Sequence, residues 1–464
     1  MSAPLLWIIL PLAISAILLA LLKYDRVIRW MGLLTSGLLS LIAFFQPVGS
    51  VLQIGGISID FTSSFYIFGR SFSLDNSDRF VILIVYMTIF FFLLLMDREF
   101  VPTKFVPLSF AIAAFLLSAL AVQPFLYSAV LVELAVLLMI LMVREKGDQP
   151  VVGILRFLIY LSLALPCILF AGWILGGAQA STSDETRLTA AAIFLLVGFS
   201  IWLAVFPFHS WLPQFAATVH PFLFGFLFSI LPVVLLLVIV DYLSSLIWLR
   251  SATYLSPALM TIGAIMVVTA GIFSSVEKQI ARLASYTVLL ETGFALFMIA
   301  LRSDQGMSLL YQSFIPRIIG LSLLCYSLSI LRQNQISLVK GGVTSLIRQF
   351  PFATLGILGS MLSIAGFPLL AAFPVRLQLL HLIGRTSLPA LIALAAGMAG
   401  FLIATVRLFV LMTFPARQKW HLRERPPQVI VLCIGLLLLV VMGLFPSIPA
   451  DMISLLAIDL PILW

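Results

Sequence analysis

A single carboxylate inside a long apolar segment is the side chain in this sequence with the clearest chemical potential. Glu133 is the only charged residue between Leu126 and Val143. A charge at the centre of a membrane helix costs roughly 2.5–3.5 kcal/mol, so it persists mainly where it faces a protein interior or a water-filled path. Other ionisable residues occupy similar apolar settings: Glu291, Arg317, Arg376, His381 and Arg407. Such a row of charges is typical of an ion conductor or of its descendant.

The composition indicates an integral membrane protein. Of the 464 residues, 62% are hydrophobic and 9% are charged, and the mean hydropathy is +1.20. Soluble globular domains do not have this balance. The net charge of +8 is explained by Lys and Arg in inner loops, where membrane proteins concentrate them. We therefore expect the lipid bilayer as the surroundings and no nucleic-acid partner.

The sequence contains no pattern that predicts a cofactor or a metal. Cys167, Cys325 and Cys433 lie inside apolar segments and lack the spacing of metal ligands. Buried free cysteines behave as small hydrophobic residues. Nucleotide, flavin and iron–sulfur motifs are missing, as is any nucleophile constellation. We expect no cofactor, no metal and no catalytic centre in this chain.

Apolar segments of about 20 residues, the length that crosses a bilayer as a helix, recur along the whole chain. About fourteen are expected, which makes the fold class all-α and polytopic. Alternation within residues 51–75 predicts a small hairpin outside the bilayer, and 449–464 suits an interfacial tail. The fourteen segments lie near 4–22, 28–47, 79–96, 105–122, 125–143, 151–175, 188–206, 216–240, 254–274, 281–301, 307–331, 352–382 (broken), 388–414 and 427–446.

The distribution of Lys and Arg predicts the orientation of these helices. Seventeen Lys and Arg lie in loops and helix ends that follow odd-numbered helices, and six follow even-numbered ones. Because positive loops stay on the inner side, both termini are expected on the outer side. The expected location is a bacterial-type inner membrane or its organellar equivalent.

Two proline pairs point to an internal repeat. Pro207 and Pro213 interrupt the seventh apolar segment, and Pro368 and Pro374 interrupt the twelfth. Proline breaks helices, and broken helices at matching points of inverted repeats indicate an ion path. Each break is the fourth helix of a five-helix unit, helices 4–8 and 9–13. The expected parts of this single membrane domain are 1–104, 105–249, 250–414 and 415–464.

Several motifs resemble the antiporter-like membrane subunits of respiratory complex I, and their relatives in multi-subunit cation/proton antiporters and membrane-bound hydrogenases. Phe206–Pro213 (FPFHSWLP) is similar to a V-P-F-H-x-W-L-P signature on helix 7. Val276–Tyr286 (VEKQIARLASY) resembles the entry to helix 10, and Ala365–Phe373 (AGFPLLAAF) the break in helix 12. Phe72–Asp75 (FSLD) resembles the stretch before helix 3. The resemblance implies fourteen helices, two inverted repeats, outer termini and partner membrane subunits.

The resemblance also implies a polar axis that conducts protons at mid-membrane. Glu133 matches the family's glutamate on helix 5, but Trp202 stands where the family has a lysine on helix 7. Glu291 stands near a histidine position on helix 10. Arg317 and Arg376 match lysines on helices 11 and 12. Arginine cannot readily release its proton, so these differences leave a purely static ion pair of Glu291 with Arg317 as an alternative.

Two histidines complete the candidate path. His209 lies in the helix 7 motif, and His381 follows Arg376 by five residues. Imidazole relays protons near neutral pH, although a structural, hydrogen-bonded histidine is the alternative. We predict Glu291 within ion-pair distance of Arg317 or Arg376, and no basic side chain from helix 7 or 8 at Glu133.

Three functions follow as hypotheses. The first is an antiporter-like subunit that conducts protons or another cation in a complex I-like assembly, driven by the redox work of its partners. The second is a diverged, non-conducting subunit with a structural or docking role, which Trp202 and the arginines favour. The third is a subunit of a non-respiratory cation/proton or bicarbonate-coupled transporter.

Overall fold

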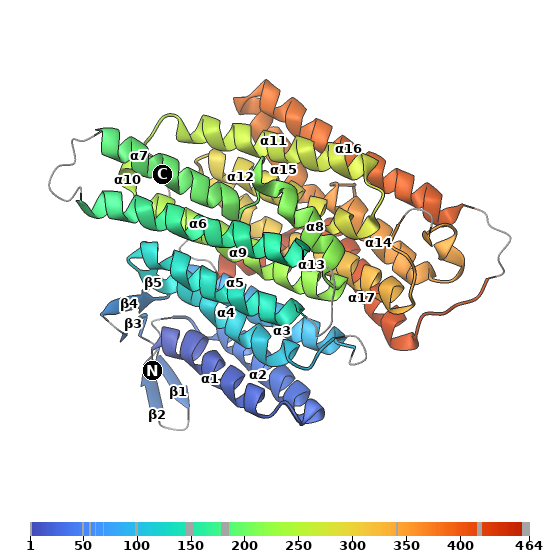
Figure 1. The fold of residues 1–464 in the computed structure, drawn as a ribbon, viewed down its shortest axis with the longest axis horizontal. Coiled ribbons are helices and arrows are strands. Elements are labelled where there is room, and N and C mark those ends of the chain that lie inside the picture. The colour runs from blue at the N-terminus through green and yellow to red at the C-terminus, as the bar shows by residue number, and fades with distance from the viewer. Residues whose placement is uncertain are drawn as a thin grey trace. The chain divides into compact units, whose positions relative to one another are not determined.

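The protein is all-α apart from two small β-sheets (Figure 1). The computed structural model describes residues 2–48, 51–54, 57–60, 62–67, 69–97, 101–144, 152–177, 185–339, 342–414 and 420–456. The chain forms two compact units. Unit 1 comprises residues 1–204, 230–250 and 453–462, and unit 2 comprises residues 205–229, 251–452 and 463–464.

Unit 1 is a helical unit with two β-hairpins before α3. A short π-helix (Leu5–Ile9) leads into the first helix. The helices of unit 1 are α1 (Leu10–Ala20), α2 (Asp25–Phe45), α3 (Arg79–Leu95), α4 (Phe105–Ala121), α5 (Ser128–Val143), α6 (Val152–Gly177), α7 (Glu185–Trp202), the second part of α9 (Pro221–Ser245) and α10 (Ile247–Arg250).

Unit 2 is helical and is built around α12. Its helices are α8 (Trp211–Thr218), the first part of α9, α11 (Leu255–Val276), α12 (Leu283–Ala300), α13 (Asp304–Gln333), α14 (Pro351–Ile364), α15 (Phe373–Thr386), α16 (Leu388–Thr413) and α17 (Pro426–Leu444). The whole apolar span of α12 is buried, whereas only 17% of the α17 span is. The exposed side of α17 carries large apolar side chains such as Leu437 and Ile430, as expected of a helix against lipid. A last helix, α18, covers Ser447–Leu456.

The predicted apolar segments agree closely with the helices. Among the described residues, ten helices are long and apolar enough to cross a membrane, and four shorter apolar helices stand at the first, fourth, seventh and twelfth predicted segments. Two of the shorter ones, α7 and α14, are the first halves of the predicted broken helices. The all-α polytopic fold is therefore confirmed, while the number of crossings and the inverted relation of the repeats stay predictions.

The region predicted as one hairpin contains two. Strands β1 (Val51–Ile54) and β2 (Ile57–Asp60) pair antiparallel, and so do β3 (Ser64–Ile67) and β4 (Arg70–Ser73). A further strand, β5 (Val122–Gln123), pairs with β4 and was not predicted. This strand is two residues long and follows α4 directly, so it has no periodicity of its own. Residues 457–464 of the predicted tail lie outside the described part of the chain.

The first half of the broken twelfth helix is capped by a distant carboxylate. Glu424 accepts hydrogen bonds from the backbone N–H groups of Phe352 (3.2 Å) and Ala353 (2.6 Å), in the first turn of α14. These groups have no partner within the helix. Glu424 thereby ties the segment before α17 to the start of α14. Burial raises the pKa of this carboxyl, and the two N–H donors act in the opposite direction.

This cap gives a pH-dependent prediction. A carboxyl whose pKa is raised by folding stabilises the fold fully below its unfolded pKa, and that contribution is lost as the pH rises through the folded value. Glu424→Gln keeps an acceptor and cannot titrate. We expect it to flatten the dependence of Tm on pH above about 4.5, whereas Glu424→Ala lowers stability by about 1 kcal/mol. Thermal unfolding from pH 4 to 8 measures both, and an unchanged slope in the glutamine variant contradicts the assignment.

Candidate functional site

The break in the twelfth helix positions the central charge of unit 2. Helix α14 ends at Ile364, and α15 begins at Phe373. Gly366 has φ +78°, and a Cβ there would lie 2.9 Å from Met398 Cε and 3.1 Å from Arg376 Cγ. Glycine is required on both counts, because an L-residue is strained at this φ and would press on the arginine stem.

The prolines of each pair have different roles. Pro207 and Pro368 lie in the breaks, as predicted. Pro213 and Pro374 do not break a helix: they lie in the first turns of α8 and α15. The prediction that Pro213 and Pro374 break a helix was wrong. A proline in the first turn of a helix lacks an N–H that would have no intrahelical partner anyway. These residues start the second half of each broken helix.

A buried ion pair joins α12 to α15. The Arg376 guanidinium donates to Glu291 Oε1, and both side chains are only 2% exposed. The guanidinium carbon also lies 3.8 Å from the centre of the Phe294 ring, three residues after Glu291 on α12. A cation over an aromatic face is attracted by the ring quadrupole. The predicted ion pair of Glu291 is confirmed.

Arg317 is part of the same cluster but not of that ion pair. It is 2% exposed on α13, and its Nη2 donates to Thr292 Oγ1 at 3.2 Å. The alternative in which Glu291 pairs with Arg317 is therefore wrong: Arg376, in the first turn of α15, binds the carboxylate. The cluster thus contains two guanidinium groups and one carboxylate, which Arg376 binds.

A groove of unit 2 is lined by α13 and α15, the helices that carry Arg317 and Arg376. Its volume is about 800 Å³. Leu377, the neighbour of Arg376 in sequence, is part of this wall. His381 is exposed and lines the groove without contacting the Glu291–Arg376 pair. The polar side chains in the lining are Asp304, Gln305, Ser308, Gln312, Gln378 and His381.

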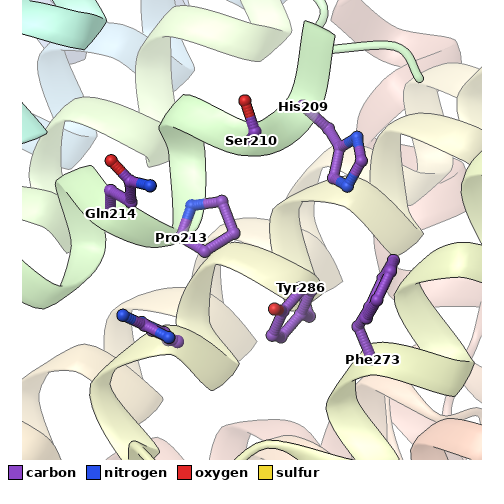
Figure 2. A pocket seen from close by; sticks show the side chains of 7 residues that line it. His209, Ser210, Pro213, Gln214, Phe273 and Tyr286 are labelled. Carbon is purple, nitrogen blue, oxygen red and sulfur yellow. The ribbon is translucent and has the colours of Figure 1, made fainter. Parts of the chain in front are cut away.

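The break in the seventh helix forms a second hollow of unit 2. After α7 ends at Trp202, a turn leads through Pro207 to a 3₁₀ segment (Phe208–Ser210) and to α8. A cavity of about 200 Å³ follows, lined by His209, Ser210, Pro213, Gln214, Phe273, Arg282 and Tyr286. Figure 2 shows His209, Phe273 and Tyr286 around one open space.

His209 is held by ring stacking. Its imidazole lies 5.5 Å from the Phe206 ring and 5.9 Å from the Phe273 ring, and Phe273 stacks in turn on Tyr286 at 6.1 Å. The buried Nδ1 of His209 has no hydrogen-bond partner among the described residues. The Tyr286 hydroxyl donates to Glu277 Oε2 at 3.3 Å. Sequence reasoning found His209 through its motif but missed Phe273 and Tyr286, which only tertiary packing brings to it.

In unit 1, Glu133 has a neutral partner. Ser162 Oγ on α6 donates to Glu133 Oε1 at 2.5 Å, a contact that sequence reasoning missed. Within the described residues Glu133 forms no ion pair; that no basic side chain of the seventh or eighth predicted helix approaches it stays a prediction. Trp202 is 4% exposed and packs against Phe199, with ring centres 6.1 Å apart. The position of the family's lysine is thus filled by a buried aromatic ring.

One family model matches the middle of the chain. Residues 175–403 match the family model described as NADH:quinone oxidoreductase/Mrp antiporter, TM. The matched region contains α12, α13 and α15, and so the whole Glu291–Arg376–Arg317 cluster. The fold and site define a polytopic membrane protein with two broken helices. Over residues 175–403 the chain is similar to the antiporter-like membrane subunits that this model describes.

Curated relatives match parts of the chain. It is 31% identical over 117 residues to NAD(P)H-quinone oxidoreductase chain 4 of Acaryochloris marina, which covers 24% of this chain and 21% of that protein. It is 28% identical over 211 residues to NADH-quinone oxidoreductase subunit N of Azorhizobium caulinodans, which covers 43% and 42%. The matched segments thus span less than half the length of either relative.

Solved structures match the fold over nearly the whole chain. A chain of the membrane-bound sulfane sulfur reductase, an archaeal respiratory membrane complex, superposes with a TM-score of 0.83 at 14% identity, covering 99% of this chain and 98% of that one. A chain of the Mrp complex from Dietzia sp. DQ12-45-1b gives a TM-score of 0.81 at 16% identity, covering 99% and 97%.

Proposed function

We propose that this chain is an antiporter-like subunit of a complex I-like assembly and conducts protons or another cation, coupled to redox work done by partner subunits. The observation that carries the proposal is the buried Glu291–Arg376 pair in the family-matched region, whose arginine lies in the first turn after a helix break. Chains retain such groups at mid-membrane chiefly on ion paths. The partners implied are other membrane subunits, and this chain itself needs no cofactor.

The arrangement of unit 2 supports a path with Glu291 as its titrating group. Arginine keeps its proton, so Arg376 acts as a fixed charge that holds the Glu291 carboxylate. A proton on Glu291 cancels the attraction and frees Arg376 to move with α15. The groove at His381 and the hollow at His209 border different helices of the same unit.

Proton transport by the purified assembly tests this proposal. The assembly is isolated through this chain, reconstituted into vesicles and supplied with its electron donor, while a pH-sensitive dye reports proton movement. We expect removal of this chain, or Glu291→Gln within it, to lower the protons moved per electron while electron transfer continues. Unchanged stoichiometry with the subunit removed refutes the proposal.

A non-conducting structural role is the second candidate, favoured by the observations in unit 1. Glu133 is bound to Ser162 rather than to a cation, and Trp202 fills the lysine position. In that case the Glu291–Arg376 pair only joins helices. An unchanged stoichiometry for Glu291→Gln and for Glu133→Gln, together with loss of the assembly on deletion, selects this role. A cation/proton or bicarbonate-coupled transporter without redox partners is selected if no oxidoreductase subunit copurifies.

The orientation proposed is both termini on the outer side of a bacterial-type inner membrane or its organellar equivalent. The seventeen-to-six distribution of Lys and Arg supports it. Alkaline phosphatase fused after Trp464 is expected to be active, because it folds outside, and a fluorescent protein fused there to remain dark. The same pair fused within 417–425 should give the opposite result. Fluorescence from the fusion after Trp464 contradicts the orientation.

A further inference from the structure

The buried cluster of unit 2 has more positive than negative charge. Arg317 and Arg376 are each 2% exposed, and Glu291 is 3% exposed. Helices α11, α14 and α17 carry no Asp, Glu, Lys or Arg. A net positive charge in a low-dielectric interior is expensive unless an anion compensates it.

Other charged side chains of unit 2 form contacts away from the cluster or lie far from it. Asp304 is the first residue of α13, so thirteen residues and roughly 20 Å of helix separate it from Arg317. Arg407 on α16 donates to the backbone carbonyls of Ser275 and Glu277 at the end of α11. Glu291 is therefore the one carboxylate near the two guanidinium groups in the described part of unit 2.

Some N–H donors of the two guanidinium groups also lack a hydrogen-bond partner among the described residues. Arg376 uses Nη2 for Glu291, while its Nε and Nη1 are buried without a hydrogen-bond partner among the described residues. The same holds for Nε of Arg317. Buried donors normally have partners, and each unmatched one costs about 1–3 kcal/mol. Water can accept a hydrogen bond from such a donor but does not neutralise the charge of the guanidinium group, whereas an anion does both.

The position of Arg376 adds a second attraction for negative charge. It lies in the first turn of α15, a helix of 14 residues. The start of a helix carries a partial positive charge, so a bound anion here meets two guanidinium groups and one helix end. Guanidinium groups suit spherical halides and planar oxyanions alike, the latter through paired N–H donors.

We propose that Arg317 and Arg376 bind one small monovalent inorganic anion beside Glu291, which makes the buried cluster electrically neutral. The anion is a ligand of unit 2 and is separate from the cation or proton that the proposed function moves. In this arrangement Arg317, the arginine without a carboxylate, is the main contributor of charge to the anion. Glu291 competes with the anion for Arg376.

Binding is tested on the full-length chain in lipid nanodiscs, without any transport assay. Thermal unfolding is followed in sodium gluconate, chloride or hydrogen carbonate at constant ionic strength and pH, and radioactive chloride is titrated in parallel. We expect a saturable rise of Tm with chloride or hydrogen carbonate but not with gluconate, and one anion bound per chain. The anion whose effect on Tm saturates at the lower concentration identifies the class of ligand, halide or planar oxyanion.

Variants assign the site. Arg317→Gln is expected to abolish the saturable rise, whereas Arg385→Gln, on the exposed end of α15, should retain it. Glu291→Gln removes the competing carboxylate and is expected to tighten binding by at least about tenfold. If Arg317→Gln fails to fold, the anion affinity of Glu291→Gln decides whether the proposed site exists. Equal Tm in all three salts, retained binding in Arg317→Gln, or unchanged affinity in Glu291→Gln overturns the proposal. Because no proton movement is measured, failure of the transport proposal leaves this result standing.

Discussion

Replacement of Arg376 by methionine is expected to destabilise the folded chain by about 3–5 kcal/mol. Methionine keeps most of the side-chain length but leaves the Glu291 carboxylate buried without its partner. The loss comes mainly from that unpaired charge and not from the missing Coulomb attraction, because forming a buried pair already cost the hydration of both groups. The contact with the Phe294 ring is lost as well. Unfolding of the purified chain in detergent by heat and by denaturant measures the change.

A double variant separates these causes. Arg376→Met combined with Glu291→Gln carries neither charge of the pair, so most of the lost stability should return. Arg385→Met, on the exposed last turn of the same helix, serves as the control and should change little. A cost below about 1 kcal/mol for Arg376→Met is the value typical of an exposed ion pair, and contradicts the burial of this one.

The helices were predictable because a bilayer imposes their length. Apolar segments near 20 residues, punctuated by charged loops, gave bounds that agree with α2, α12 and α16 within a few residues. The two breaks were predictable from proline pairs within apolar segments. What the spacing did not distinguish was the role of each proline. A proline between two helical halves and one in the first turn of the second half look the same in sequence, and the observed bounds alone separate Pro207 from Pro213.

Contacts within the site were less predictable than its residues. Glu291 was expected to pair with Arg317 or Arg376, and the choice of Arg376 depends on where α15 restarts after Gly366. Ser162, Thr292 and Phe294 carry no charge and match no motif, so nothing in their sequence context predicted contacts with charged groups. Phe273 and Tyr286 reach His209 through the packing of α11 and α12 near the break. Such contacts depend on helix rotation and register, which a hydropathy pattern does not determine.

The differences from the family's lysines change the chemistry expected of each unit. In unit 2, arginines stand where the resemblance implies lysines, so under the proposed function Glu291 and water carry any transfer. In unit 1, Ser162 donates a hydrogen bond to Glu133 without contributing charge. A hydroxyl partner stabilises a carboxylate less than a cation does.

Glu133→Gln is expected to lower coupled proton transport by about tenfold or more, with little effect on assembly. Glutamine keeps the volume of the side chain and can accept the hydrogen bond from Ser162, but it cannot take up or release a proton. Ser162→Ala is the matched variant: it removes the hydrogen bond and leaves the carboxyl free to titrate, so transport should fall less than in Glu133→Gln. The measurement is the number of protons moved per electron in vesicles, with the amount of intact assembly determined on a native gel. Normal transport by a fully assembled Glu133→Gln complex means that unit 1 does not conduct through this carboxylate, and that Glu133 and Ser162 serve only to join α5 to α6.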